Sequence, residues 1–204
     1  IWTITDASGN VTTCTQTVTV TDTQVPIFTT CPPNAIDQIT NGGCTKVPGT
    51  LTDPVVTDNC AIDRLTFVLS GATTFTSPAT GMNYARTATF NVGLTLVTYT
   101  ATDIHGNSST CTHTVWIQNL NAPQFSATCP ANVAANADLN RCDANLVIPV
   151  PVISNPCNEK YRVSNDRVGA IDSMNVNGIY PVGVTTIIWT ITDASGNVTT
   201  CTQT

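Results

Sequence analysis

The first seventeen residues of this chain, IWTITDASGNVTTCTQT, recur letter for letter as residues 188–204. A β-strand needs only the right pattern of apolar and polar positions, so a shared fold does not by itself enforce identity over this length. A third, diverged copy begins at Val97, and in all three copies the Asp, the Gly-Asn pair and the Cys fall into line. The chain is therefore built from repeats, which constrains its fold more than any other feature.

The corresponding cysteines of the three copies lie 97 and 90 residues apart. Two unlike units in tandem make a longer period of 187 residues, after which the identical sequence returns. We expect residues 1–22 to be the C-terminal hairpin of a preceding domain, residues 23–121 a complete domain, and residues 122–204 a second domain truncated in its last strand. On this interpretation the sequence is one window on a longer polymer, and its strand at Thr204 would continue as VTVTDTQVP.

Each unit consists of short alternating stretches, such as LTLVTYTATD and CTHTVWIQ, broken by Gly, Pro, Asn and Asp. No stretch has a convincing apolar period of 3.6 residues. About seven strands per unit predict an all-β fold of two packed antiparallel sheets, the immunoglobulin type of sandwich. The linkers TDTQVPIF and QNLNAPQF are short and contain Pro, so we expect tandem immunoglobulin-like β-sandwich domains arranged as a stiff rod.

Composition excludes several classes of partner and cofactor. Seven Lys and Arg stand against 13 Asp and Glu and form no basic run, so neither nucleic acid nor an anionic membrane surface is an expected partner. No apolar run approaches the roughly 20 residues of a membrane span. The nine cysteines include no CxxC pair and indicate an oxidising compartment, so we expect an extracellular or cell-surface segment. No cofactor is expected, and zinc is disfavoured because the only histidines are His105 and His113.

Several motifs recur from unit to unit. They are a Cys-Pro start (FTTCPPN, FSATCPAN), TDNC after the second strand, an aromatic-x-Val-Gly stretch (FNVG, YPVG), VTYTATDIHGNSSTC or IIWTITDASGNVTTC, and a closing D-x-x-x-P. Together they resemble the HYR (hyalin repeat) domain family. The resemblance implies an immunoglobulin-like sandwich in extracellular, multi-domain proteins associated with adhesion, and it brings no catalytic residues. The second unit departs from the pattern, with ISNPC for VTDNC and Asn119 in the place of Asp22.

Four cysteines per unit allow three pairings. We predict that the first cysteine of each unit bonds the last, because the first and last strands of such a sandwich can lie side by side. The other two would then bond each other, although a straight strand between Cys44 and Cys60 would hold them roughly 40 Å or more apart. Pairing of Cys31 with Cys60 is the alternative. The predicted disulfides, each within one unit, are Cys31–Cys111, Cys44–Cys60, Cys129–Cys201 and Cys142–Cys157, and Cys14 is left unpaired.

Catalysis is not expected. Asp103 and His105 share one turn, TDIHGN, where part of a Ser-His-Asp triad could sit. The other copies of this turn read TDASGN, so a turn role explains these residues better. Glu159 is the only glutamate, which leaves no paired-carboxylate signature of a glycosidase. We predict a protein that is not an enzyme.

Calcium is a minor expectation. Asp6, Asp22 and Asp58 occupy turns and linkers, where their carboxylates could hold this hard cation between domains. The alternative is that each aspartate caps its own turn. Because Asp22 becomes Asn119 and Asp58 becomes Asn155 in the second unit, any such site would not recur in every unit.

Asn10, Asn107 and Asn197 each begin an N-glycosylation sequon in the same hairpin turn. Glycans are therefore possible partners, and the alternative is that Gly-Asn is simply favourable turn chemistry. We expect the three tryptophans to pack in or against the sandwiches and not to form a sugar-stacking platform. These tryptophans are Trp2, Trp116 and Trp189.

The leading functional hypothesis is a structural one. The chain would be a non-enzymatic segment of a long, disulfide-stabilised tandem fibre or surface filament, whose partners are neighbouring copies of the same repeat, head to tail, with lateral association left open. The alternative is an adhesin stalk or a module that binds carbohydrate or protein. An accessory domain of a secreted enzyme is a third hypothesis. Repeats without a candidate active site favour the first.

Overall fold

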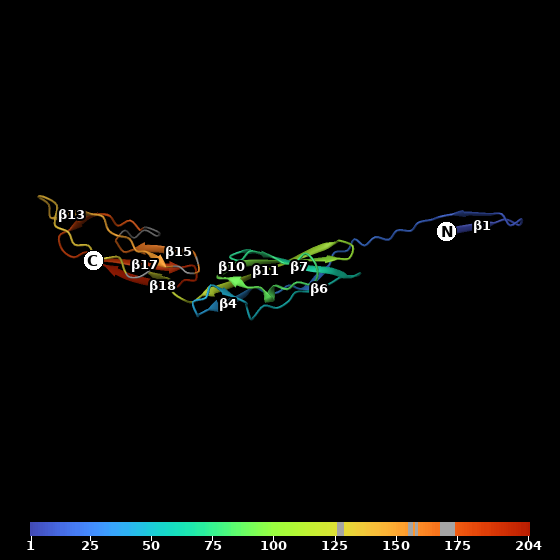
Figure 1. Ribbon diagram of the computed structural model, residues 1–204, viewed down its shortest axis with the longest axis horizontal. Helices are drawn as coiled ribbons and strands as arrows, with labels where there is room; N and C mark the ends of the chain where they lie inside the picture. Colours follow the sequence, from blue (N-terminus) through green and yellow to red (C-terminus); the bar gives the residue numbers. More distant parts are fainter. Residues whose placement is uncertain (126–128, 155–156, 158, 168–173) are drawn as a thin grey trace.

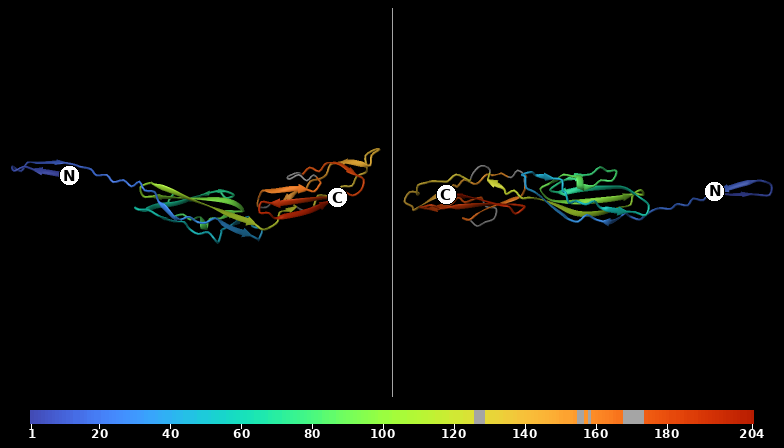
Figure 2. Two further views of the ribbon diagram at one scale, coloured as in Figure 1. Left: turned by 180° about the vertical axis from the view of Figure 1, so that it is seen from behind. Right: turned by 90° about the horizontal axis from the view of Figure 1, so that it is seen from below.

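The computed structural model describes residues 1–125, 129–154, 157, 159–167 and 174–204. Three bodies follow one another along a line: a small N-terminal hairpin, then residues 23–121, which we call domain 1, then residues 122–204, which we call domain 2 (Figure 1). The views from behind and from below show the same elongated arrangement (Figure 2). The elongated arrangement expected from the short linkers is therefore present, and its stiffness stays a prediction.

The N-terminal hairpin stands apart from both domains. Its strands β1 (Trp2–Thr5) and β2 (Val11–Cys14) form a two-stranded sheet of their own, and every residue in them is exposed. In the turn, the Asp6 carboxylate accepts hydrogen bonds from the backbone N–H (2.8 Å) and the side-chain amide (2.7 Å) of Asn10. Gly9 has a φ of 85°, which a residue with a side chain rarely adopts. The hairpin has local structure but no core.

Domain 1 is a sandwich. Its elements are β3 (Ile27–Thr30), β4 (Ala35–Ile39), β5 (Thr45–Lys46), β6 (Val55–Thr57), β7 (Ile62–Gly71), β8 (Phe75–Thr76), a turn of 3-10 helix at Ala85–Thr87, β9 (Phe90–Asn91), β10 (Gly93–Asp103) and β11 (Ser108–Asn119). One sheet has the order β4-β11-β10-β7-β8, and the pairs β3-β6 and β5-β9 form the rest. The long hairpin of β10 and β11 is the centre of the domain.

Alternation along β10 and β11 explains this core. Val97, Tyr99 and Ala101 of β10 are buried, as are Val115 and Ile117 of β11, while their neighbours are more exposed. Successive side chains of a strand point to opposite faces, so these residues share one face. The core cluster consists of Ile39, Leu65, Phe67, Leu69, Ala85, Phe90, Val92, Val97, Tyr99, Ala101, Cys111, Val115 and Ile117.

The C-terminal half of β11 pairs with β4 at the edge of the sheet. These strands pair in parallel from Val115 opposite Ala35 to Asn119 opposite Ile39. Val115 and Ile117 have no exposed surface at all. The C-terminal half of the last strand of domain 1 therefore contributes Val115 and Ile117 to the core of that domain.

Domain 2 repeats the plan with shorter elements. They are β12 (Gln124–Phe125), β13 (Asp143–Leu146), β14 (Ile153–Ser154), β15 (Tyr161–Asn165), β16 (Gly178–Pro181), β17 (Ile187–Asp193) and β18 (Val198–Gln203). The sheets have the orders β15-β17-β18, β13-β16 and β12-β14, so β18 is an edge strand. The core cluster consists of Ile148, Val163, Val176, Tyr180, Ile187 and Trp189.

The fold class predicted from the sequence is confirmed: the chain is all-β and its domains are immunoglobulin-like sandwiches. Throughout the described ranges, the structure contains no helix with the length and apolar character needed to span a membrane.

Candidate functional site at the inter-domain junctions

The candidate functional residues gather where one body of the rod meets the next. The first junction is the end of domain 1 that faces the N-terminal hairpin, and the second junction lies between domains 1 and 2. The first junction consists of Asp22, Asp58, Asn59, Cys60, Asp103, His105 and Asn107. The second junction consists of Cys44, Asn119, Cys157, Glu159, Asp193, Ser195 and Asn197.

At the first junction, the turn between β10 and β11 holds the preceding linker. The Asp103 carboxylate accepts hydrogen bonds from the backbone N–H groups of His105 and Asn107, each at 2.8 Å, and from the Asn107 side-chain amide at 2.8 Å. The same Asn107 amide also donates to the backbone carbonyl of Asp22 at 3.3 Å. The Asp therefore rigidifies the turn, and the Asn connects the turn to the linker.

The second junction repeats this arrangement with the turn between β17 and β18. Asp193 Oδ1 accepts hydrogen bonds from the backbone N–H groups of Ser195 (2.9 Å) and Asn197 (2.8 Å). The Asn197 amide donates to Asp193 Oδ2 at 2.8 Å and to the carbonyl of Asn119, the counterpart of Asp22, at 2.6 Å. The D-x-x-G-N motif thus fixes the angle at which a linker enters the domain that follows it.

Asn119 is held by two further groups of domain 2. Its side-chain amide donates to Glu159 Oε1 at 2.7 Å, and its backbone N–H donates to Ser195 Oγ at 3.1 Å. Its own Oδ1 accepts from the backbone N–H of Asn121 at 3.0 Å, as Asp22 Oδ1 accepts from Gln24. Sequence reasoning missed this role of Glu159, because only the fold brings it to the linker.

Electrostatics distinguish the first junction from the second. His105 Nδ1 lies 3.3 Å from Asp22 Oδ2, and the Asn59 amide donates to Asp22 Oδ1 at 3.2 Å. The pKa of Asp22 is lowered, chiefly by the hydrogen bond from the backbone N–H of Gln24, against the opposing effect of burial. The hydrogen bond to Asp22 raises the pKa of the Cys60 thiol, so this thiol is protonated at neutral pH.

Three carboxylates of the first junction form an acidic cluster. Oxygen atoms of Asp22, Asp58 and Asp103 lie within 4.8 Å of one another. Asp58 Oδ1 is buried without a hydrogen-bond partner. Such oxygens suit a hard cation such as calcium. Of the three residues expected to hold calcium, Asp22 and Asp58 meet here, whereas Asp6 lies in the separate hairpin. Calcium binding stays a prediction.

Two disulfides join the first and last cysteines of each unit, as the sequence predicts. Cys31 bonds Cys111 with a Cα–Cα distance of 5.9 Å, and Cys129 bonds Cys201 with a Cα–Cα distance of 5.6 Å. In both units the bridge connects the start of the domain to its last strand. Each disulfide therefore closes nearly the whole domain into one covalent ring.

The other two predicted pairings are wrong. Cys44 of domain 1 bonds Cys157 of domain 2, with a Cα–Cα distance of 5.0 Å, so the bridge crosses the second junction. Cys157 also packs against the core cluster of domain 1. Within the described residues, which include all nine cysteines, Cys60, Cys142 and Cys14 are unbonded and exposed. Neither Cys44–Cys60 nor Cys142–Cys157 forms.

The length of the sandwich explains this correction. Cys44 lies at the second junction, whereas Cys60 lies beside Asp22 at the first, because the chain between them runs along the domain through β5 and β6. A disulfide needs its two Cα atoms within about 7 Å, so cysteines at opposite ends of the domain cannot pair. Each cysteine can therefore reach only the neighbouring body of the rod.

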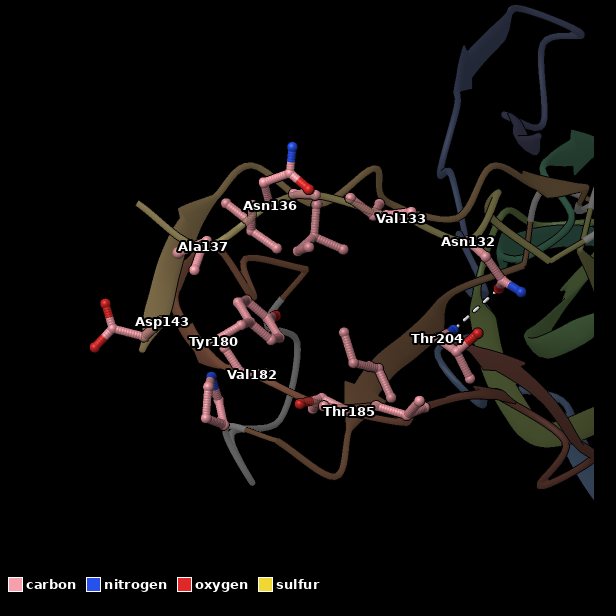
Figure 3. Close-up of a pocket in the computed structure, with 18 of the residues that line it drawn as sticks. Asn132, Val133, Asn136, Ala137, Asp143, Tyr180, Val182, Thr185 and Thr204 are labelled. Atoms are coloured by element: carbon pink, nitrogen blue, oxygen red, sulfur yellow. Dashed lines mark hydrogen bonds between the residues drawn. The ribbon is translucent and has the colours of Figure 1, made fainter. Parts of the chain in front are cut away.

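Domain 2 contains an apolar hollow of about 690 Å³. Figure 3 shows Val133, Tyr180, Val182 and Thr185 around it, with Thr204 at its rim. The Thr204 backbone N–H donates to Asn132 Oδ1 at 3.0 Å. The hollow lies beside the end of β18. At the equivalent place in domain 1, the second half of β11 pairs with β4 in the same sheet.

The sequon residues are structural members of their turns. Each of Asn107 and Asn197 donates from its side-chain nitrogen both to the Asp of its turn and to a linker carbonyl. Asn10 makes the first of these contacts and is exposed. The turn-chemistry alternative thus accounts for all three positions, and glycosylation stays a prediction.

The tryptophans differ in burial. Trp189 is completely buried in domain 2, and Trp116 on β11 is half-buried. Trp2 is 65% exposed, so the expectation that it packs against a sandwich is wrong for this chain. The hairpin that carries it has no sandwich beside it.

The residues considered for catalysis lie apart or have structural partners. Asp103 binds backbone N–H groups and not the His105 ring, which faces Asp22. His113 is buried in β11, where its ring stacks on Tyr99 with 6.1 Å between ring centroids, and burial lowers its pKa. The described residues contain no nucleophile-base arrangement at these positions.

Residues 21–117 match the HYR domain family model. Over these residues the chain belongs to the HYR domain family. The matched HYR domain begins one residue before Asp22 and ends within β11, so it includes the first junction and nearly all of domain 1.

The chain is also similar to Hyalin of Strongylocentrotus purpuratus, with 30% identity over 199 residues. The alignment covers 94% of this chain and 14% of Hyalin, so the chain spans a small part of that relative's length.

Solved structures resemble the chain only loosely. Drosophila N-cadherin EC1-4 has 16% identity, a TM-score of 0.32 and coverage of 88% of this chain and 48% of that one. The Bacteroides ovatus SGBP-B, in complex with a mixed-linkage heptasaccharide, has 13% identity, a TM-score of 0.32 and coverage of 89% and 48%. At these TM-scores the resemblances carry no functional argument.

Proposed function

We propose that this chain is a non-enzymatic, extracellular structural segment of a fibre or surface filament built from tandem HYR domains. The observation that carries the proposal is the second junction. There, a disulfide between Cys44 and Cys157 and the hydrogen bonds around Asn119 fix one domain to the next. A flexible string of independent modules needs none of these contacts, whereas a stiff filament needs them at each joint.

Disulfides support the extracellular setting, because such bonds persist in oxidising compartments and are rare in the cytosol. The described residues hold three of them, one across a domain boundary. Similarity to Hyalin over most of the chain agrees with an adhesion-type repeat.

Two features support continuation of the rod: the apolar hollow in domain 2, and the exposed apolar residues that follow the N-terminal hairpin. Val18 is 80% exposed and Val20 is 91% exposed. By the repeat, they correspond to Val115 and Ile117, which are fully buried in the second half of β11. The hollow beside Thr204 lies where domain 2 would receive these two residues. A following repeat would therefore complete the core of domain 2 with its Val18 and Val20.

A fused chain tests this proposal. Residues 1–204 are followed directly by residues 18–204, so that Thr204 is joined to Val18 as Thr17 is in the natural sequence. We expect small-angle X-ray scattering to show a single stiff rod about twice as long. The amides of the joined Val18 and Val20 should also become protected from hydrogen exchange. Two globular bodies joined by a mobile linker would contradict the fibre.

The fused chain contains its own control. Replacing the joined Val18 and Val20 by Asp should loosen domain 2 of the first copy, because it places two charges in an apolar hollow. The same two substitutions at the free N-terminal copy should change nothing measurable, since those side chains already face water. Equal effects at both places would show that the hollow does not receive this strand.

The alternative is a binding module, and the hollow is the observation that favours it. Ligand pockets of proteins have volumes of about 300–1,000 Å³ and largely apolar linings. Tyr180 and Val182 give this hollow such a lining. In a binding module the fused chain would leave the hollow open to a ligand, whereas in a filament the joined strand would occupy it.

A further inference from the structure

Two of the unbonded cysteines occupy the positions of a bonded pair. In the repeat, Cys142 corresponds to Cys44 and Cys60 corresponds to Cys157. Cys44 and Cys157 form the disulfide across the second junction. Domain 2 thus has a Cys44-type cysteine without its partner, and domain 1 has a Cys157-type cysteine without its partner.

The structural surroundings of Cys142 match those of Cys44. The Cys44 carbonyl accepts a hydrogen bond from the Val92 N–H at 3.0 Å, and the Cys142 carbonyl accepts one from the Val182 N–H at 3.0 Å. Each cysteine immediately precedes a short strand, β5 or β13, that pairs with the corresponding strand β9 or β16. The two cysteines therefore hold the same place at the same end of their domains.

Cys60 matches Cys157 in the same way. The pairs β3-β6 and β12-β14 have one register, since Ile27 lies opposite Thr57 and Gln124 lies opposite Ser154. Cys60 and Cys157 each follow three residues after the strand end. The two positions are thus equivalent in their domains.

The strands next to the two cysteines lie at opposite ends of the two-domain unit. Strand β13, which follows Cys142, lies at the end of domain 2 that is farther from domain 1, and β6, which precedes Cys60, lies at the end of domain 1 toward the N-terminal hairpin (Figure 1). Both thiols are exposed. One copy of the repeat therefore has an exposed Cys142 near the end that would meet the following copy and an exposed Cys60 near the end that would meet the preceding copy.

We propose that Cys142 forms a disulfide with Cys60 of the next copy of the repeat, so that every junction of the filament carries the covalent bridge seen between Cys44 and Cys157. This inference rests on the proposed function, because it requires copies joined head to tail. It goes beyond the proposed function because it adds a disulfide at each boundary between copies. Cys14 stays outside this scheme, since its counterparts Cys111 and Cys201 bond within their own domains.

The bond requires an oxidant, and a low-molecular-weight disulfide such as oxidised glutathione supplies it. The thiolate of one cysteine attacks a sulfur of this disulfide and releases one glutathione thiol. The second cysteine then attacks the mixed disulfide and releases the other. The two protein thiols lose two protons and two electrons in total, and glutathione disulfide is reduced to two thiols.

The fused chain also tests this inference. In one variant, Cys60→Ser in the first copy and Cys142→Ser in the second copy leave only the inner pair at the join. After incubation in a glutathione redox buffer, we expect this pair to be lost from iodoacetamide labelling. A non-reduced digest should contain the linked Cys142 and Cys60 peptides.

The matched variant leaves only the outer pair, by Cys142→Ser in the first copy and Cys60→Ser in the second. Both outer cysteines should remain fully labelled. If scattering shows a stiff rod while the inner pair is still labelled, the disulfide is refuted and the filament stands. If the fused chain is not a stiff rod, the proposed function falls and takes this inference with it.

Discussion

Residues 1–17 and residues 188–204 have one sequence and two environments. In both copies Trp pairs across the hairpin with Cys, Trp2 with Cys14 and Trp189 with Cys201. The Trp indole N–H donates to a Gln side chain at 3.1 Å in the first copy and at 3.0 Å in the second. The turn glycines have φ values of 85° and 87°. The local geometry is therefore the same.

Burial is what differs between the copies. Trp2 is 65% exposed and Ile4 is 69% exposed, whereas Trp189 and Ile191 are completely buried. In domain 2 the strand β17 also pairs with β15, and the rest of the sandwich covers its inner face. The N-terminal hairpin has no such neighbour.

The comparison separates what a short sequence specifies from what the domain supplies. Turn capping, strand register and the Trp–Gln hydrogen bond are specified by seventeen residues alone. Stability requires the third strand and the opposite sheet, since a lone two-stranded hairpin is marginal in water. The comparison also provides matched controls, because each substitution can be made at either copy.

The largest effect is expected from the two tryptophans. Trp189→Ala should destabilise domain 2 by about 3–5 kcal/mol, because it leaves a large cavity in the core. Trp2→Ala should leave the stability of both domains unchanged, since its side chain is mostly in water. Urea unfolding followed by circular dichroism measures both. A comparable loss in the Trp2 variant would mean that the hairpin is packed against something in solution.

A smaller effect is expected from the two glutamines. Gln203 is 1% exposed, accepts from the Trp189 indole and donates to the Ala131 carbonyl at 2.8 Å. Gln203→Ala leaves the indole N–H of the fully buried Trp189 without this partner and should cost about 1–3 kcal/mol. Gln16→Ala should have no measurable effect on the same unfolding curve. Equal stabilities of the two variants would contradict the buried hydrogen-bond network.

The smallest effect concerns the turn aspartates and pH. Burial raises the pKa of Asp103, but the hydrogen bonds from Asn107, His105 and Gly106 outweigh it and the net pKa is lowered. Because the pKa of Asp103 is lower in the folded state, its carboxylate stabilises domain 1 at pH values above the unfolded pKa of about 4. This stability is lost as the pH falls through the folded pKa.

Asp103→Asn should therefore flatten the decline of the domain 1 melting temperature in acid. The pKa of Asp6 is lowered as well, chiefly by the Asn10 side chain. No domain depends on this hairpin, so Asp6→Asn should leave the acid profile unchanged. Melting curves recorded from neutral pH to about pH 3 compare the two.

The sequence predicts the sandwich fold and the disulfides Cys31–Cys111 and Cys129–Cys201, because the repeat marks each first and last strand. It misassigns Cys44, since a repeat suggests self-contained units and gives no sign that a bridge crosses their boundary. The length of chain between Cys44 and Cys60 was the one sequence feature that argued against their pairing. The junction role of the D-x-x-G-N turn was equally hidden, because the linker carbonyl it binds is 78 residues away in the case of Asn197.

Disulfide mapping of the 204-residue chain tests the central claim, that neighbouring domains are covalently joined at their junction. Free thiols are blocked with iodoacetamide, the unreduced protein is digested, and linked peptides are identified by mass spectrometry. We expect peptides that link Cys44 to Cys157, with Cys60 and Cys142 alkylated. Linked peptides of Cys44 with Cys60 and of Cys142 with Cys157 would contradict the account, because each unit would then be closed on itself.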